Sequence, residues 1–156
     1  MNGKLELTFR SNLSITAVFM KPEQVFRIAN AAILPPWLLM LILPKASITA
    51  QVIDSNVFTI GLALLYVFYV AQSLGKSTKG DFTTLDGIGK MFSNPVALLA
   101  GWVHYLVFDL FVGAWIWRDA LQNGYAHWVL LLCLPFTLMM GPVGLLLYLG
   151  LKMWVL

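Results

Sequence analysis

The residues with the clearest capacity for chemistry are His104 and Asp109, which lie in one apolar stretch of the chain, Gly101 to Gly113. An imidazole can accept and donate a proton near neutral pH, and a carboxyl group is a common partner in acid–base chemistry. Five residues of α-helix separate two side chains by about 140° around the axis, so each should face a different neighbouring helix. The alternative is structural, because polar side chains inside apolar bundles also hold helices in register. Both interpretations stay open.

Other groups that could bind or orient a ligand lie in the same stretch or in neighbouring apolar stretches. They are polar or aromatic: Asn30, Trp37, Tyr66, Tyr69, Trp102, Tyr105 and Phe108. The chain has only two histidines, His104 and His127, and one cysteine, Cys133. It also has no glycine-rich phosphate loop and no nucleophile elbow. We therefore expect no metal, no cofactor and no nucleic-acid partner.

Long apolar segments must position these residues. Of the 156 residues, 60% are hydrophobic and 11% are charged, and the mean hydropathy is +0.81. A soluble domain carries about 25% charged residues, and a chain this short cannot bury so much apolar surface in a soluble core. Four apolar runs are long enough to cross a bilayer, at residues 25–43, 57–74, 95–117 and 128–151. The predicted fold class is all-α, an integral membrane four-helix bundle.

Two features refine this organisation. The pairs Pro35-Pro36 in the first run and Gly141-Pro142 in the fourth should kink their helices, because proline has no backbone N–H. Residues 1–24 contain a short mixed stretch without a small-residue cleavage site, which predicts a retained cytoplasmic or interfacial arm. Residues 25–156 then form one transmembrane domain.

The basic residues predict the orientation of the helices in the membrane. Eight of them flank the same ends of the four runs: Lys4, Arg10, Lys21, Arg27, Lys76, Lys79, Lys90 and Lys152. The opposite ends carry Lys45 and Arg118. Because lysine and arginine accumulate on the cytoplasmic side, both termini are predicted to be cytoplasmic, in the inner membrane if the protein is bacterial.

Three stretches together resemble a known family. They are the Gly101–Gly113 run followed by Trp115, Arg118 and Asp119, the segment Phe26–Asn30 leading to Leu34-Pro35-Pro36-Trp37, and the segment Met140–Tyr148. This pattern, which covers about residues 25 to 151, is similar to the abscisic-acid-deficient-four-like family. That family includes plant neoxanthin synthase and many bacterial proteins of unknown role.

The resemblance implies a carotenoid or another isoprenoid as ligand within the bilayer. Neoxanthin formation is an isomerisation without net redox change, which needs an acid at the epoxide oxygen and a base at a carbon-bound proton. His104 and Asp109 would fill these roles, oriented by Asn30, Tyr66 or Tyr69. Aromatic side chains, among them Trp37, Trp102 and Phe108, would line the groove.

Two further interpretations remain. The protein could bind a lipid or isoprenoid without catalysis, or it could be a structural subunit of a larger membrane complex. Membrane lipid is the expected partner in every case, and an oligomer is left open.

Overall fold

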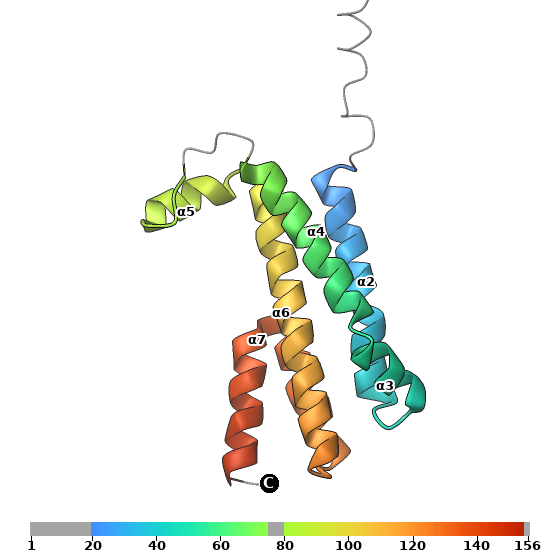
Figure 1. The fold of residues 1–156 in the computed structure, drawn as a ribbon. Helices are drawn as coiled ribbons and strands as arrows, with labels where there is room; N and C mark the ends of the chain where they lie inside the picture. Colours follow the sequence, from blue (N-terminus) through green and yellow to red (C-terminus); the bar gives the residue numbers. More distant parts are fainter. Residues whose placement is uncertain (1–19, 75–79, 155–156) are drawn as a thin grey trace, which may run out of the picture.

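The computed structural model describes residues 20–74 and 80–154, and within these ranges it is all-helical, without a strand (Figure 1). Four segments in it are long and apolar enough to cross a membrane, as the sequence predicted. The predicted N-terminal arm lies mostly outside the described residues. The helices are α2 (Pro22–Ile42), α3 (Ser47–Asp54), α4 (Val57–Leu74), α5 (Leu85–Phe92), α6 (Pro95–Gln122) and α7 (His127–Trp154).

Helix α6 is the centre of the molecule, and α2, α4, α5 and α7 all pack against it. It begins where the side chain of Asn94 accepts a hydrogen bond from the Val96 N–H, with Pro95 in the first turn, where its missing N–H costs nothing. It continues to Gln122, past residue 117, where the predicted apolar run ends. The polar residues there do not end the helix because neighbouring helices pair with them: Arg118 Nε donates to Asp54 at 2.8 Å.

Helices α3 and α5 were not predicted, because both are short and lie in segments that the sequence analysis treated as connections. Helix α3 follows α2 closely and is tied to it by Thr49, whose hydroxyl donates to the Leu43 carbonyl at 2.6 Å. Helix α5 lies across the end of the bundle where α6 begins (Figure 1). Pro35 and Pro36 lie inside α2, which remains one helix from Pro22 to Ile42.

Helix α7 turns back on itself halfway along its length. At Met140 the backbone leaves the helical region, with φ −150° and ψ 64°, next to the predicted Gly141-Pro142 kink. The first arm, 127–139, runs antiparallel to α6 from the end where α6 finishes. The second arm, 141–154, runs back towards that same end (Figure 1).

Three contacts fix the direction of the second arm. Gly141 lies against Asp109, Tyr148 packs edge-on to Trp115 with ring centroids 5.6 Å apart, and Lys152 Nζ bonds Asp119 at 2.7 Å. From one contact to the next the residue numbers increase in both helices, so the second arm of α7 runs parallel to α6.

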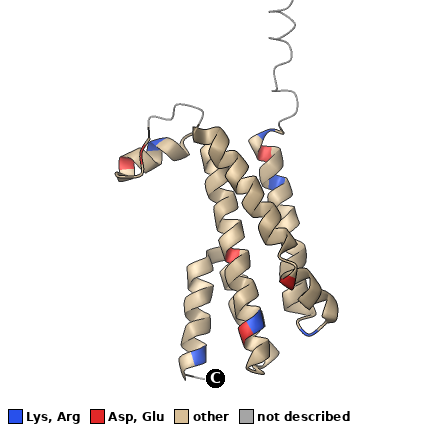
Figure 2. Ribbon diagram, viewed as in Figure 1, with Lys and Arg blue, Asp and Glu red and all other residues tan. Residues whose placement is uncertain are grey.

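The prediction of a fourth helix running the length of the bundle is therefore wrong, although the position of its kink was right. The bend is much sharper than a kink. Lys152 lies at the same end as Arg118, whereas the sequence analysis assigned the two to opposite ends. Among the described residues, Lys152 therefore joins Lys45 and Arg118 at one end of the bundle. Figure 2 shows charged positions mainly near the helix ends, with one acidic position halfway along α6.

Candidate functional site

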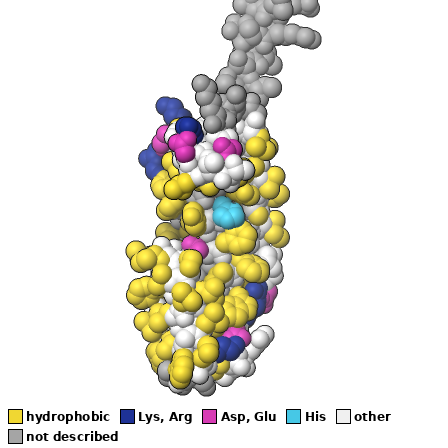
Figure 3. Space-filling model, turned by 90° about the vertical axis from the view of Figure 1, so that its left-hand side faces the viewer, with side chains coloured by type: hydrophobic (Ala, Val, Ile, Leu, Met, Phe, Trp, Pro, Cys, Tyr) yellow, Lys and Arg dark blue, Asp and Glu magenta, His cyan; other side chains and the backbone are white. Residues whose placement is uncertain are grey.

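A recess of about 290 Å³ lies between α4, α5 and the first half of α6, beyond the bend of α7. It exists because α7 reaches only halfway along α6 and leaves this part of the α6 surface uncovered. Figure 3 shows a histidine side chain within a largely hydrophobic surface, below a group of charged side chains. The lining residues are mostly apolar: Tyr66, Val70, Ser73, Leu74, Phe82, Met91, Phe92, Ala97, Ala100, Gly101, His104 and Tyr105.

His104 is the basic group of this recess, and aromatic rings surround it. Its imidazole centroid lies 5.4 Å from that of Tyr66 on α4, 4.6 Å from Phe108 and 6.3 Å from Tyr105. Within residues 20–74 and 80–154 the imidazole makes no hydrogen bond or ion pair, and it is exposed. Both ring nitrogens are thus available to a ligand, on a surface otherwise suited to hydrocarbon.

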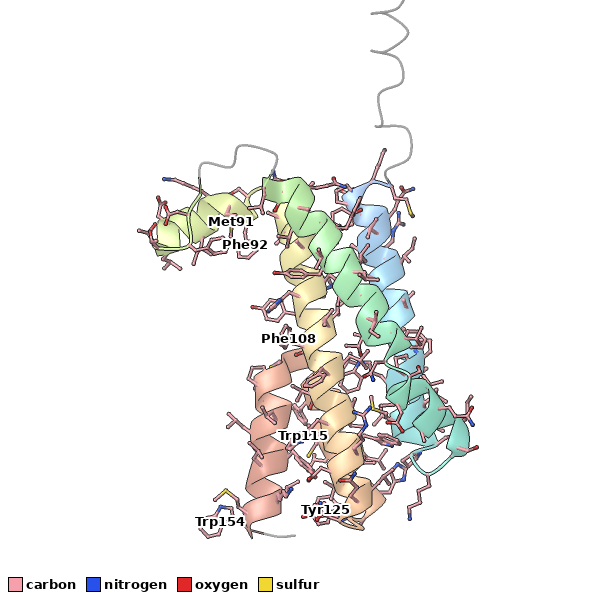
Figure 4. All side chains as sticks on the ribbon, in the orientation of Figure 1. Met91, Phe92, Phe108, Trp115, Tyr125 and Trp154 are labelled. Atoms are coloured by element: carbon pink, nitrogen blue, oxygen red, sulfur yellow. The ribbon has the colours of Figure 1, made fainter. Side chains whose placement is uncertain are left out.

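Helix α5 supplies the other end of the recess through Met91 and Phe92 (Figure 4). The ring of Phe92 lies so close to Gly101 that a Cβ atom at that position would be 2.7 Å from it. The start of α5 is held by Thr84, whose hydroxyl accepts a hydrogen bond from the Gly87 N–H at 3.0 Å.

The turn that precedes α5 is organised around the carboxylate of Asp81. It accepts hydrogen bonds from the Thr83 hydroxyl at 2.6 Å, the Thr83 N–H at 2.8 Å and the Thr84 N–H at 3.0 Å. These bonds, led by the one from the Thr83 hydroxyl, hold the pKa of Asp81 below its ordinary value, because they stabilise the charged form.

Asp109 lies apart from His104, at the bend of α7. Its carboxylate is half-buried against Gly141, so close that a Cβ at Gly141 would overlap it. Asp109 has no hydrogen-bond or ion-pair partner among the described residues and does not line the recess of His104. The structure agrees with the expectation that the two groups face different neighbours, and it does not bring them into one pocket.

The other predicted residues divide between the recess and three different surroundings. Tyr66, Tyr105 and Phe108 surround His104. Trp102 turns away from it and donates to Asn30 Oδ1 at 3.3 Å, beside a second apolar cavity of about 290 Å³ between α2 and α6.

Trp37 and Tyr69 are core residues. Trp37 is 1% exposed and packs against Gly113, where a Cβ would overlap the indole ring, and its Nε1 is buried without a partner among the described residues. Tyr69 is 5% exposed, and its ring is edge-on to that of Phe68 at 5.2 Å.

Sequence reasoning missed the contribution of α5. A signal was present, because Leu85, Ile88 and Phe92 recur at helical spacing directly after Thr84, a favourable N-cap residue. Among the described residues no three His, Cys, Asp or Glu side chains come together to hold a metal ion. The groups in the recess that can transfer a proton or form a hydrogen bond include the His104 imidazole and the hydroxyls of Tyr66 and Tyr105.

Comparison with known proteins decides the family. The family model described as ABA DEFICIENT 4-like matches residues 24–148. The chain belongs to this ABA4-like family. It is 36% identical over 130 residues to "Protein ABA DEFICIENT 4, chloroplastic" from Arabidopsis thaliana, a match that covers 78% of this chain. The chain spans 57% of the length of that relative. No solved structure matches the chain. The matched range contains His104, Asp109 and the bend of α7.

Proposed function

We propose that this protein is an integral membrane protein that binds an oxygenated isoprenoid lipid of the carotenoid kind in the recess around His104 and isomerises it there. Membership of the ABA4-like family supports the ligand class. The observation that carries the proposal is the His104 imidazole itself. It has no partner among the described residues, and aromatic rings surround it on a surface that four long apolar segments would turn towards lipid.

The proposed reaction opens an epoxide next to a polyene and leaves an allene. A proton is transferred to the epoxide oxygen as its C–O bond breaks, which gives a hydroxyl group. A proton is removed from the adjacent chain carbon, and the electron pair of that C–H bond forms the new double bond. One proton is added and one is removed, so the product is an isomer and no oxidant is required.

The geometry favours His104 with a tyrosine over His104 with Asp109. His104 would be the base that removes the carbon-bound proton, and the hydroxyl of Tyr66 would donate to the epoxide oxygen. The rings of these two residues are 5.4 Å apart across the recess, whereas Asp109 lies against Gly141 at the bend of α7. In that case Asp109 would have a structural role in the packing of the helices.

A second function, binding without catalysis, is favoured by one observation. His104 and Asp109, which the sequence suggested as an acid–base pair, lie in two separate places. The recess contains His104 but not Asp109. A carotenoid-binding protein would need the apolar recess and a hydrogen bond from His104, but no proton transfer.

The test is expression in a carotenoid-producing bacterial host that makes an epoxycarotenoid, followed by analysis of the pigments in cells and in the purified protein. His104→Gln keeps a hydrogen-bonding group and removes the titratable nitrogen. We expect it to retain bound pigment and to lose conversion by about two to four orders of magnitude. The matched control is His127→Gln, at the other end of the bundle, where His127 Nε2 lies 2.7 Å from the Leu41 carbonyl oxygen. This variant should convert as the parent does.

The other outcomes are equally informative. If His104→Gln converts as well as the parent, His104 is structural and the catalytic proposal fails. If the parent retains pigment without converting it, the binding function replaces it. If the parent neither binds nor converts an epoxycarotenoid, the carotenoid assignment for this protein is wrong.

A further inference from the structure

Helix α7 has the length of a membrane span but not the shape of one. Its arms, 127–139 and 141–154, contain 13 and 14 residues. Each arm is therefore about 20 Å long at 1.5 Å per residue, which is shorter than the hydrocarbon core of about 30 Å. Neither arm can cross the bilayer alone. Yet its most apolar stretch of 18 residues has the highest mean hydropathy among the four segments, 2.2, so α7 belongs in the membrane and not in water.

Close contacts hold the two arms together and hold the second arm against α6. Gly144 lies directly against the backbone of Thr137, where a Cβ would be 2.6 Å from the Thr137 Cα. At the other end of the arm, Lys152 Nζ bonds both carboxylate oxygens of Asp119 at 2.7 and 2.8 Å, and the buried Tyr148 hydroxyl donates to the same carboxylate. These contacts require the arms to be antiparallel and to share one end.

The bend itself has the properties that non-helical backbone needs inside a membrane. Gly141 is buried against α6, which shields part of the broken backbone from lipid. Pro142 follows at the start of the second arm, where its missing N–H leaves one fewer unsatisfied donor. Such interruptions are tolerated at membrane depth only where protein covers them or where they line a cavity.

The bend also limits the depth of the His104 recess. From Ala97, which lines the recess, to Asp109 at the bend is about 18 Å along α6, roughly half of a bilayer. A rod-shaped lipid as long as the bilayer is thick cannot lie inside it along its whole length. The polar groups inside, His104, Tyr66, Tyr105 and Ser73, suit an end group that carries oxygen.

We infer that α7 is a re-entrant hairpin that enters and leaves the membrane on the side opposite the start of α2, so that the His104 recess opens into one leaflet only and receives a single oxygenated end group of an isoprenoid lipid. The lipid part of this inference rests on the proposed function, whereas the hairpin part does not. It follows that Trp154 and the start of α2 lie on opposite sides of the membrane.

The hairpin is tested by cysteine labelling in intact and permeabilised cells with a membrane-impermeant maleimide. Cys133 is buried and is the one cysteine in the sequence, so Cys133→Ala gives a cysteine-free background. Single cysteines are then introduced as Met20→Cys, Gln122→Cys and Trp154→Cys, all at exposed positions. We expect Trp154→Cys to be labelled from the same side as Gln122→Cys and from the opposite side to Met20→Cys. Labelling of Trp154→Cys together with Met20→Cys would overturn the hairpin.

The lipid part is tested with a purified epoxycarotenoid added to the protein in detergent, with retained pigment as the readout. Tyr105 and Phe111 are matched exposed aromatic residues of α6, 63% and 57% exposed, and only Tyr105 lines the recess. Tyr105→Ala should lower pigment retention several-fold, and Phe111→Ala should not. Equal losses would overturn the assignment of the ligand to the recess. If the parent retains no pigment while the labelling pattern is as expected, the proposed function fails and the hairpin stands.

Discussion

Replacing Gly144 with alanine should have opposite effects on stability in the hairpin and in a straight helix. In a straight helix, residues 137 and 144 are two turns apart, about 10 Å along the axis, and do not meet. Alanine would then stabilise the protein by about 1 kcal/mol, because glycine is the poorer helix former. In the structure, the added methyl group meets the backbone of Thr137, with its Cα 2.6 Å away.

The backbone of Thr137 cannot rotate out of the way as the end of a side chain can, so the two arms must separate. Overpacking of this kind costs about 1–3 kcal/mol, part of which the better helix propensity of alanine offsets. Gly150→Ala is the control, because Gly150 is in the same arm and a Cβ there meets nothing within 4 Å. Propensity cancels between the two variants, so Gly144→Ala should be less stable than Gly150→Ala by about 1–3 kcal/mol.

The single cysteine of the chain provides the assay. Cys133 is fully buried, so a thiol-reactive fluorogenic dye reports unfolding of the purified protein in detergent as the temperature rises. We expect Gly144→Ala to unfold at a lower temperature than the parent, and Gly150→Ala at the same or a higher temperature. If Gly144→Ala is stabilised as much as Gly150→Ala, the close contact with Thr137 does not exist and the reasoning behind the hairpin is refuted.

Two further predictions concern charged groups at opposite ends of the molecule. Lys152→Met keeps the apolar stem but leaves Asp119 without its cation, and should destabilise the protein by about 1–3 kcal/mol in the same dye assay. The control Lys90→Met removes an exposed ion pair within α5 and should change stability by less than about 0.5 kcal/mol, so equal effects would contradict the role of Lys152. Because the folded state lowers the pKa of Asp81, its contribution to the turn before α5 is complete above about pH 4 and is lost as pH falls through the lowered value. A carboxyl titration by NMR should show a midpoint below the ordinary value that rises in Thr83→Val, and a normal midpoint in the parent would contradict this.

Part of the site could be predicted from the sequence. A histidine inside an apolar helix is noticeable because its placement there costs free energy. His104, the adjacent Tyr105 and Phe108 one turn away were identified in this way. The structure places Asn30, Trp37 and Tyr69 outside the recess that contains His104. Depth along a helix follows from counting residues, but the direction in which a side chain faces depends on the rotation of each helix, which these evenly apolar segments do not specify.

The sequence by itself determined that the chain is helical, that four segments are long and apolar, and that the last of them breaks near Gly141-Pro142. These are local properties, since hydropathy, run length and the missing N–H of proline act within a few residues. Only the tertiary structure decided that the break reverses the chain. That outcome depends on the close approach of Gly144 to Thr137 and on the pairing of Lys152 with Asp119, 33 residues away along the chain. A straight and a reversed α7 have the same hydropathy, so packing against α6 chooses between them, and that choice leaves the recess of His104 open.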